Sequence, residues 1–209
     1  MSISDTATPK TTKGQHFAPE VLTEVEFRGL LKACSGRAPT GIRNRALLVA
    51  MYRGGLRVSE ALALKPGDVD PERGTVRVLH GKGDRSRVVG LDDGAMAIIQ
   101  RWMDHRRTLQ LRNGPLFCTL AGTHVLPSYV RTLMRRIAGK AGIEKRVHPH
   151  GLRHSHAADL VADGVPVNLI QQQLGHANLS VTDRYLRHVA PGDVIAMGRA
   201  RKPFRMEEN

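Results

Sequence analysis

The stretch "GTVRVLHGKGDRSRVVGL", residues 74–91, decides the fold class, because the apolar residues change here from helical spacing to alternation. Val76 and Val78 occupy alternate positions, a Gly-Lys-Gly-Asp turn follows, and Val88 and Val89 come after the turn. Apolar runs on both sides of a glycine-rich turn are typical of a β-hairpin. The stretch therefore predicts one small antiparallel sheet.

Helical patterns lie on both sides of this hairpin. Thr23 and Glu26 have the spacing of a capping box at the start of the first helix, and a second apolar stripe ends at Gly54-Gly55. Helices are predicted over residues 23–34, 42–53, 56–64 and 95–103, and from starts near Pro127, Pro149, Pro166 and Asn178. We expect one domain that is mainly α with a small antiparallel β-sheet, which is an α+β fold.

The charge of the chain indicates its partner. Of the 209 residues, 32 are Lys or Arg and 19 are Asp or Glu, so the formal net charge is +13. An excess of this size repels itself unless a polyanion neutralises it, which favours a nucleic-acid partner over a merely soluble basic protein. Aromatic residues make up only 4% of the chain, which favours duplex phosphates over stacking on unpaired bases.

Cysteine content and hydropathy indicate a cytoplasmic protein. Cys34 and Cys118 are the only cysteines and lie outside any Cys-x-x-Cys pattern, so neither a disulfide framework nor a cysteine zinc site is expected. The N-terminal residues lack the apolar core of a signal peptide, and no apolar run approaches the length of a membrane span. We expect a cytoplasmic, nucleoid-associated protein without a membrane partner.

The stretch "HPHGLRHSHAADL", residues 148–160, holds four histidines and an arginine in a predicted helix. Pro149 suits the first helical position, which puts His150 and Arg153 on one face close to the positive end of the helix dipole. A phosphate binds favourably at that end. The stretch therefore predicts a phosphate-binding site.

Two alternatives remain open for the same stretch. His150 and His154 are four residues apart, but Gly151 stands where a His-Glu-x-x-His zinc motif has its glutamate, so a metal site is disfavoured. In the other alternative, Leu152, Ser155 and Asp159 form the buried face and the imidazoles line a solvated one.

Further polar residues stand at element ends elsewhere in the chain. Arg57 follows the Gly-Gly turn, and Glu60 lies three residues on, where it can orient Arg57. Lys82 lies at the hairpin tip, His176 directly follows a predicted helix end, and Tyr185 comes nine residues later. Each position taken alone is weak evidence for a site, whereas the whole set in this order is a strong signal.

The set resembles the tyrosine recombinase, or phage integrase, family of site-specific DNA strand-exchange enzymes. The resemblance covers residues 17–190 and corresponds to the catalytic domain of that family. The family motifs match Arg57 in Gly-Leu-Arg-x-Ser-Glu, the hairpin lysine Lys82, His150, Arg153 and His154 in His-x-x-Arg-His, His176 in Leu-Gly-His, and the nucleophile Tyr185. Glu60 and His154 are expected to support the other six.

The chemistry of phosphodiester cleavage explains why an arginine pair belongs in such a site. Attack by a hydroxyl builds negative charge on the non-bridging oxygens, and two fixed guanidiniums offer bidentate donors at that place. Arg57 and Arg153 are expected to form this clamp, and His176 to add a further donor. Lysine at either arginine position would lose the fork geometry.

Two proton transfers complete the expected reaction. Tyrosine has a reference pKa near 10, so a cationic pocket and a nearby base must favour its phenolate. Tyr185 is the expected nucleophile and His150 the candidate base. The departing 5′-oxygen needs a general acid, and the resemblance assigns that role to Lys82. Tyr52 and Tyr129 lie in apolar stripes and are expected to be packing residues.

The expected reaction requires no cofactor and no metal. A covalent tyrosyl-phosphate keeps the energy of the cleaved bond, so a 5′-hydroxyl can reverse the step without ATP. Gly81-Lys82-Gly83-Asp84 does not form a phosphate-binding loop motif, and no carboxylate cluster for magnesium is visible.

The expected domain organisation follows from the extent of the resemblance. Residues 1–16 are rich in Ser, Thr and Lys and are expected to form a disordered tail, so the N-terminal core-binding domain typical of the family is expected to be missing. Residues 191–209 are expected to form a C-terminal tail that either exchanges between protomers or stays disordered. The position before the His-x-x-Arg helix, commonly Thr or Ser in the family, is His148, a weaker cap.

The predicted function is a phage or mobile-element integrase that acts on double-stranded DNA, as a homo-oligomer (a tetramer) on that DNA, with an accessory excision or DNA-bending factor as a further expected partner. A type IB topoisomerase-like enzyme that nicks and reseals is the alternative within enzymes. A catalytically idle DNA-binding regulator of recombination sites is the alternative outside them.

Overall fold

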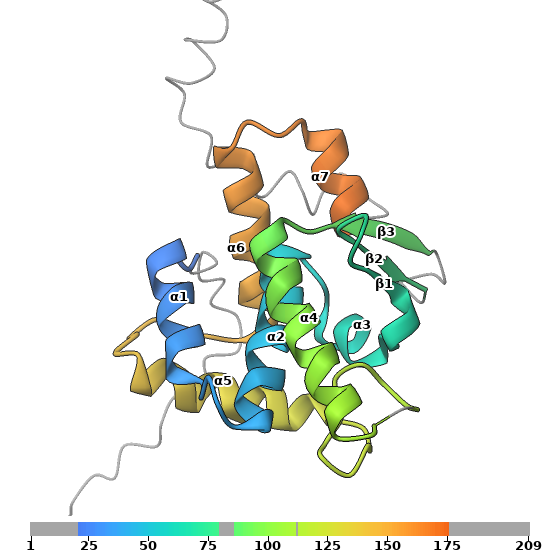
Figure 1. Ribbon diagram of the computed structural model, residues 1–209. Helices are drawn as coiled ribbons and strands as arrows, with labels where there is room; N and C mark the ends of the chain where they lie inside the picture. The colour runs from blue at the N-terminus through green and yellow to red at the C-terminus, as the bar shows by residue number, and fades with distance from the viewer. Residues whose placement is uncertain (1–20, 80–85, 112, 176–209) are drawn as a thin grey trace, which may run out of the picture.

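The computed structural model describes residues 21–79, 86–111 and 113–175 (Figure 1). The expectations that lie outside the described residues concern Lys82, His176, Tyr185, a helix near Asn178, and the tails 1–16 and 191–209. No helix among the described residues is long and apolar enough to cross a bilayer.

The described chain is mainly helical, which confirms the predicted fold class. The α-helices are α1 (Glu24–Ala33), α2 (Pro39–Arg53), α3 (Val58–Ala63), α4 (Asp93–Thr108), α5 (Pro127–Lys140), α6 (Pro149–Ala162) and α7 (Val167–Leu174). Proline opens α2, α5 and α6, where its missing N–H removes no helical hydrogen bond. The predicted capping box of α1 is present, since the Thr23 hydroxyl accepts from the Glu26 amide and the Glu26 carboxylate accepts from the Thr23 amide.

The predicted hairpin is confirmed and carries one more strand than expected. Strands β1 (Val69–Asp70), β2 (Thr75–Val78) and β3 (Arg87–Gly90) form an antiparallel sheet in the order β1-β2-β3. Val76 and Val89 are opposite each other and buried, whereas Val88 is 60% exposed. β1 follows a 3-10 helix, η1 (Pro66–Asp68), and has only two residues, which is too short for an alternation to show in the sequence.

Helix α2 is the centre of the core and is buried on almost all sides, because α4 and α6 pack against it. This exceeds the single apolar stripe that the sequence indicates. Tyr52 is fully buried, stacks on Phe27 with ring centroids 3.8 Å apart, and donates a hydrogen bond to Asp159, which confirms its packing role. Tyr129 is 36% exposed and its hydroxyl accepts a hydrogen bond from Arg43 of α2.

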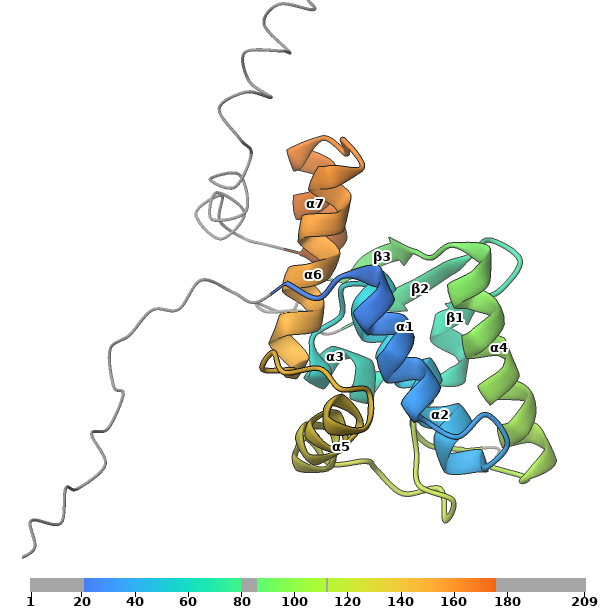
Figure 2. The same cartoon turned by 90° about the vertical axis from the view of Figure 1, so that its left-hand side faces the viewer.

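Helices α6 and α7 lie at one side of the molecule and α4 at the other (Figure 2). α7 packs against both α6 and β3, and a small cluster of Ala157, Ile170 and Leu174 fills the contact between the two helices. The amide of Leu22 donates to the Ser155 hydroxyl at 2.8 Å, which joins the beginning of the described chain to α6. The turn before α3 and the C-terminal end of α7 meet beside α6, because Arg153 of α6 donates to a main-chain carbonyl of each.

Candidate active site

The turn from α2 to α3 sets the position of Arg57. Gly55 adopts φ +60°, a conformation that other residues rarely adopt, and lets the chain reverse directly after α2. Arg57 is the N-cap of α3, and its amide donates to the Glu60 carboxylate at 2.9 Å. Glu60 is the third residue of the helix, so its carboxylate can reach back to the N-cap residue. The contact by which Glu60 is predicted to orient Arg57 is therefore local.

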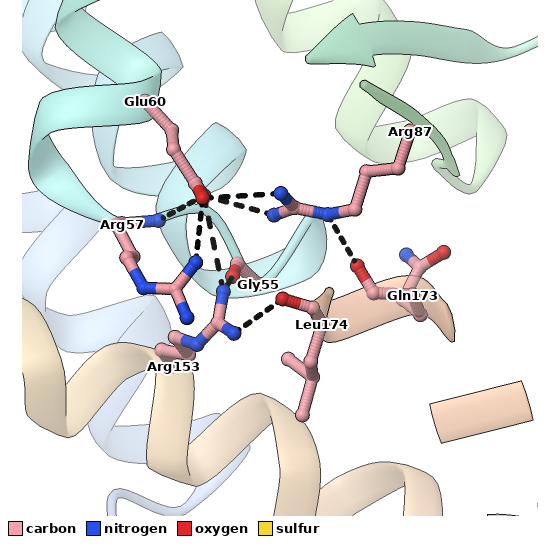
Figure 3. A network of polar contacts seen from close by, with 7 residues as sticks. All are labelled: Gly55, Arg57, Glu60, Arg87, Arg153, Gln173 and Leu174. Atoms are coloured by element: carbon pink, nitrogen blue, oxygen red, sulfur yellow. Dashed lines mark hydrogen bonds and ion pairs between the residues drawn. The ribbon is translucent and has the colours of Figure 1, made fainter. Parts of the chain in front are cut away.

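Glu60 gathers three arginines around one buried carboxylate (Figure 3). Arg57 Nη1 lies 2.7 Å from Oε1, and Arg87 donates to both oxygens at 3.0 and 2.8 Å. Arg153 Nη1 lies 3.8 Å from Oε2. Burial alone would raise the pKa of Glu60, but the hydrogen bonds from Arg87 and Arg57 outweigh burial and lower this pKa to about 2. The carboxylate therefore stays charged throughout the physiological range.

Arg153 is brought from α6 to the same place. Its side chain is 1% exposed, its Nη1 donates to the Gly55 carbonyl at 2.6 Å, and its Nη2 donates to the Leu174 carbonyl. The Gly55 carbonyl lies within the α2–α3 turn and the Leu174 carbonyl belongs to the last residue of α7, so Arg153 ties both segments to α6. The structure thus brings the two predicted clamp arginines together on Glu60.

The histidines of α6 occupy different environments. His148 is the N-cap, and its Nδ1 accepts from the Gly151 amide at 3.1 Å, so an imidazole takes the place of the usual hydroxyl. His150 is exposed and its ring meets that of His154 edge to face, with centroids 4.2 Å apart. The alternative that the imidazoles line a solvated face is wrong for His154 and His156, which are 7% and 4% exposed.

His156 is buried next to the Gly-Gly turn without a hydrogen bond to its Nε2 among the described residues. Burial, together with the charges of Arg53 and Arg153, lowers the pKa of His156 to about 4. The imidazole is therefore neutral at pH 7. Its ring packs against Gly55.

A cavity of about 430 Å³ opens beside Arg57, His150 and Arg153. Its polar lining is Arg57, Ser59, Arg131, Arg146, His148, His150 and Arg153. A second cavity of about 440 Å³ shares Arg131, Arg146 and His148 with the first and adds Arg135. No acidic side chain lines the first cavity. A lining of this composition can hold an anion such as a phosphate.

Sequence reasoning missed three arginines of this region. Arg131 and Arg146 line the cavity but stand in no recognised motif. Arg87 lies on the buried side of the hairpin, because it is two residues before Val89 and is paired with Val78. Its side chain is 10% exposed. The alternation that predicts the hairpin also places Arg87 on the apolar side of the strand. An arginine at such a position requires a buried partner, so the sequence does contain a signal for it.

The predicted residues Lys82, His176 and Tyr185 lie outside the described residues, and no contact of theirs is assigned. His176 directly follows Gly175, the last described residue of the α7 end. Within the described ranges, no group of three or more His, Cys, Asp or Glu side chains could hold a metal ion.

The fold is a helical domain with a three-stranded sheet, and an arginine-lined cavity beside a buried glutamate can hold a phosphate. The model of the phage integrase family matches residues 20–191. The chain therefore belongs to the phage integrase family, the tyrosine recombinases, which confirms the resemblance predicted from the motifs.

Curated relatives agree with this assignment. The chain is 38% identical to tyrosine recombinase XerC of Halalkalibacterium halodurans over 182 residues, which cover 84% of this chain and 60% of the relative. It is 36% identical to tyrosine recombinase XerD of Ralstonia nicotianae over 193 residues, which cover 91% of this chain and 62% of the relative. The chain thus spans about three fifths of the length of these relatives.

Solved structures show the same fold. XerA recombinase superposes with a TM-score of 0.76 at 30% identity, over 91% of this chain and 68% of that protein. XerH site-specific recombinase bound to its palindromic difH substrate gives a TM-score of 0.72 at 29% identity, over 91% and 55%. The catalytic domain of bacteriophage HP1 integrase gives 0.60 at 22% identity and is covered over 94% of its length, against 87% of this chain, which shows a common fold.

Proposed function

We propose that this protein is a site-specific recombinase that cleaves and rejoins double-stranded DNA through a covalent 3′-phosphotyrosyl intermediate on Tyr185. The observation that carries the proposal is the pair Arg57 and Arg153, which come from separate helices and meet on one buried carboxylate at the wall of a cationic cavity. His150 lines the same cavity.

The arginine pair stabilises the charge that develops during cleavage. The non-bridging oxygens of the scissile phosphate gain negative charge in the transition state, and guanidiniums held in advance need no reorganisation to meet it. Glu60 and the Gly55 and Leu174 carbonyls hold the two side chains. The clamp is therefore preorganised before DNA arrives.

The covalent step exchanges one phosphodiester for another. The Tyr185 oxygen attacks phosphorus and gives its proton to His150, while the bond from phosphorus to the 5′-oxygen breaks and Lys82 protonates that oxygen. His176 donates a further hydrogen bond to the phosphate. A 5′-hydroxyl from another strand then attacks the phosphotyrosine and restores the free tyrosine. The sequence of steps consumes no cofactor.

The cavity lining also supports binding to duplex DNA. Arg131 and Arg135 lie one turn apart on α5 and are both exposed, so their charges can follow the phosphate backbone away from the reacting phosphorus. The structural relative XerH is bound to a DNA substrate. The net charge of +13 points to the same partner.

We further propose that a homo-oligomer, a tetramer, acts on DNA. Exchange between two duplexes cuts four strands, and each cut holds one phosphotyrosine. The four scissile phosphates lie at four separate places on the DNA, so each is cut by its own bound chain.

The test is covalent trapping on a nicked duplex. A nick a few nucleotides to the 3′ side of the scissile phosphate lets the short fragment that carries the released 5′-hydroxyl diffuse away, so the phosphotyrosine cannot be reversed. The substrates are palindromic duplexes of the kind that XerH binds. We expect a protein–DNA adduct with the wild type and with Tyr129→Phe, and none with Tyr185→Phe.

The remaining outcomes separate the alternatives. Arg153→Lys keeps the positive charge but loses the bidentate geometry of the guanidinium, so this variant should form the adduct at least about 100-fold more slowly. Absence of an adduct on every duplex, with binding retained, would identify an idle DNA-binding regulator. Relaxation of supercoils without strand exchange would identify a topoisomerase-like enzyme.

A further inference from the structure

Arg87 occupies an unusual place for a charged residue. It is the first residue of β3, and its side chain is 10% exposed among the sheet, α3 and α7. Its guanidinium donates bidentate hydrogen bonds to the two carboxylate oxygens of Glu60, with distances of 3.0 and 2.8 Å. Arg87 does not line the cavity, whereas Arg57 and Arg153 do. It therefore meets Glu60 without facing the space where a phosphate would bind.

The charges of this cluster show what Arg87 contributes. Glu60 holds Arg57 in place, but a carboxylate beside an anionic phosphate also cancels part of the positive charge that the phosphate needs. The fork from Arg87 neutralises Glu60 from the side away from the cavity. The positive charges of Arg57 and Arg153 then remain available to a bound anion.

Arg87 also joins the sheet to the end of α7 (Figure 3). Its Nε donates to the Gln173 carbonyl at 3.0 Å, and the Gln173 side chain bonds to both main-chain groups of Gly90 at 3.1 and 3.3 Å. Gly175 is packed so tightly here that an added Cβ would lie 2.9 Å from the Arg87 Cδ. Cations are favourable at a helix C-terminus, so both Arg87 and Arg153 stabilise this end of α7.

We propose that Arg87 is a positioning residue of the recombinase site: as the buried counter-ion of Glu60 it leaves the charges of Arg57 and Arg153 to the scissile phosphate, and it fixes the C-terminal end of α7 against β3. This inference rests on the proposed function for its role in strand cleavage. The contacts themselves are independent of that function.

The first experiment measures adduct formation in a single turnover with saturating protein on the nicked duplex. Arg87→Met should lower the rate constant by roughly 10- to 100-fold, because small displacements of a clamp have effects of that size. Arg87→Lys keeps the charge and should recover part of the rate. Arg77→Met is the matched control, since Arg77 lies in the same sheet with its side chain 58% exposed and should keep the wild-type rate.

A double-mutant comparison tests whether Arg87 acts through Glu60. In a Glu60→Gln background, Arg87→Met should change the rate constant by less than about threefold, because the effects of coupled residues do not multiply. A loss of folded protein lowers the amplitude of the reaction instead of its rate constant, so the two effects are read separately. A wild-type rate constant for Arg87→Met, or multiplying effects in the double variant, would overturn the inference.

A second probe does not depend on Tyr185. Inorganic phosphate is titrated into the protein, and the ring resonances of His150 report its binding. Arg87→Met should weaken phosphate binding several-fold and Arg77→Met should leave it unchanged. Unchanged binding in Arg87→Met overturns the counter-ion role even if the wild type forms no adduct. Absence of an adduct with phosphate binding weakened by Arg87→Met contradicts the proposed function alone.

Discussion

Arginines serve this protein in two contrasting settings. In the arginine network, Arg57, Arg87 and Arg153 surround the buried carboxylate of Glu60. On the exposed face of α5, Arg131 and Arg135 carry the same charge in contact with solvent. The first group is held by hydrogen bonds at defined distances, whereas the second is free to rotate and is screened by salt.

The comparison shows that the exact position of a charge and the total amount of charge have different effects. A buried guanidinium held by a carboxylate and main-chain carbonyls can act at one point in space, and its removal leaves other charges without partners. An exposed guanidinium adds attraction along a surface, and its removal changes little else. Substitutions in the network should therefore affect folding and chemistry together, and substitutions on α5 should affect DNA affinity without affecting folding.

The largest effect is expected for Glu60→Gln. The substitution removes the carboxylate with which the network pairs among the described residues, so buried guanidiniums lose their counter-ion at a cost of about 3 kcal/mol in the free energy of unfolding. Urea denaturation measures this change. Asp104→Asn removes the exposed partner of Arg107 and should cost no more than about 0.5 kcal/mol. Equal losses in the free energy of unfolding for the two variants would contradict the expected difference between buried and exposed arginines.

A loss of comparable size is expected for Gly55→Ala, which disturbs the network through the backbone. An added Cβ would lie 2.5 Å from the His156 Cδ2 and 2.8 Å from the Leu174 Cδ2, at a φ of +60°. Strain and overpacking together should cost about 3 kcal/mol. Gly139→Ala in α5 has no atom within 4 Å of the added carbon and should stabilise the protein slightly. Thermal melting of both variants tests the prediction, and a neutral Gly55→Ala would contradict it.

A smaller, pH-dependent effect is expected from His156. Its pKa is about 4 in the folded protein against a reference value near 6.5, so the unfolded chain binds more protons between these values. Stability is therefore complete above pH 6.5 and falls as the pH drops toward 4, with a loss of about 2 kcal/mol at pH 5. His156→Leu should remove this part of the pH dependence. Parallel stability curves for variant and wild type would show that His156 is not the titrating group.

The smallest effect is expected on α5. Arg131→Gln and Arg135→Gln should each weaken duplex binding by about 1 kcal/mol or less and lower the slope of log affinity against log salt by about 1. The unfolding free energy should stay within about 0.5 kcal/mol of the wild type. Fluorescence anisotropy at several salt concentrations gives the slope, and Arg107→Gln on the far helix α4 is the control. A full slope in both variants would place the backbone contacts elsewhere.

Local patterns were sufficient to predict most of the elements. The capping box at Thr23, the Gly-Gly end of α2 and the alternation around the hairpin each have a local physical cause, and each was confirmed. β1 was missed because two residues have no periodicity. The burial of α2 on nearly all sides was missed because it depends on which helices pack around it.

The site residues also divide into those that a local pattern predicts and those whose place depends on the fold. Arg57, Glu60 and Arg153 were found by motif, but no local rule shows that residues 57 and 153 share one carboxylate across the fold. Arg87 stood outside every motif, and only its place on the apolar side of β3 signals its burial. The catalytic roles of all the predicted site residues stay predictions, and Lys82, His176 and Tyr185 lie outside the described part of the chain.

The long reach of Arg153 has a consequence for how the molecule folds. Arg153 and Gly55 are 98 residues apart, and Leu22 and Ser155 are 133 apart, so the site closes only when distant segments have met. Contacts of such high sequence separation slow folding. During synthesis, Glu60 emerges from the ribosome long before α6 exists and stays hydrated until then. The candidate active site is therefore one of the last parts of the protein to assemble.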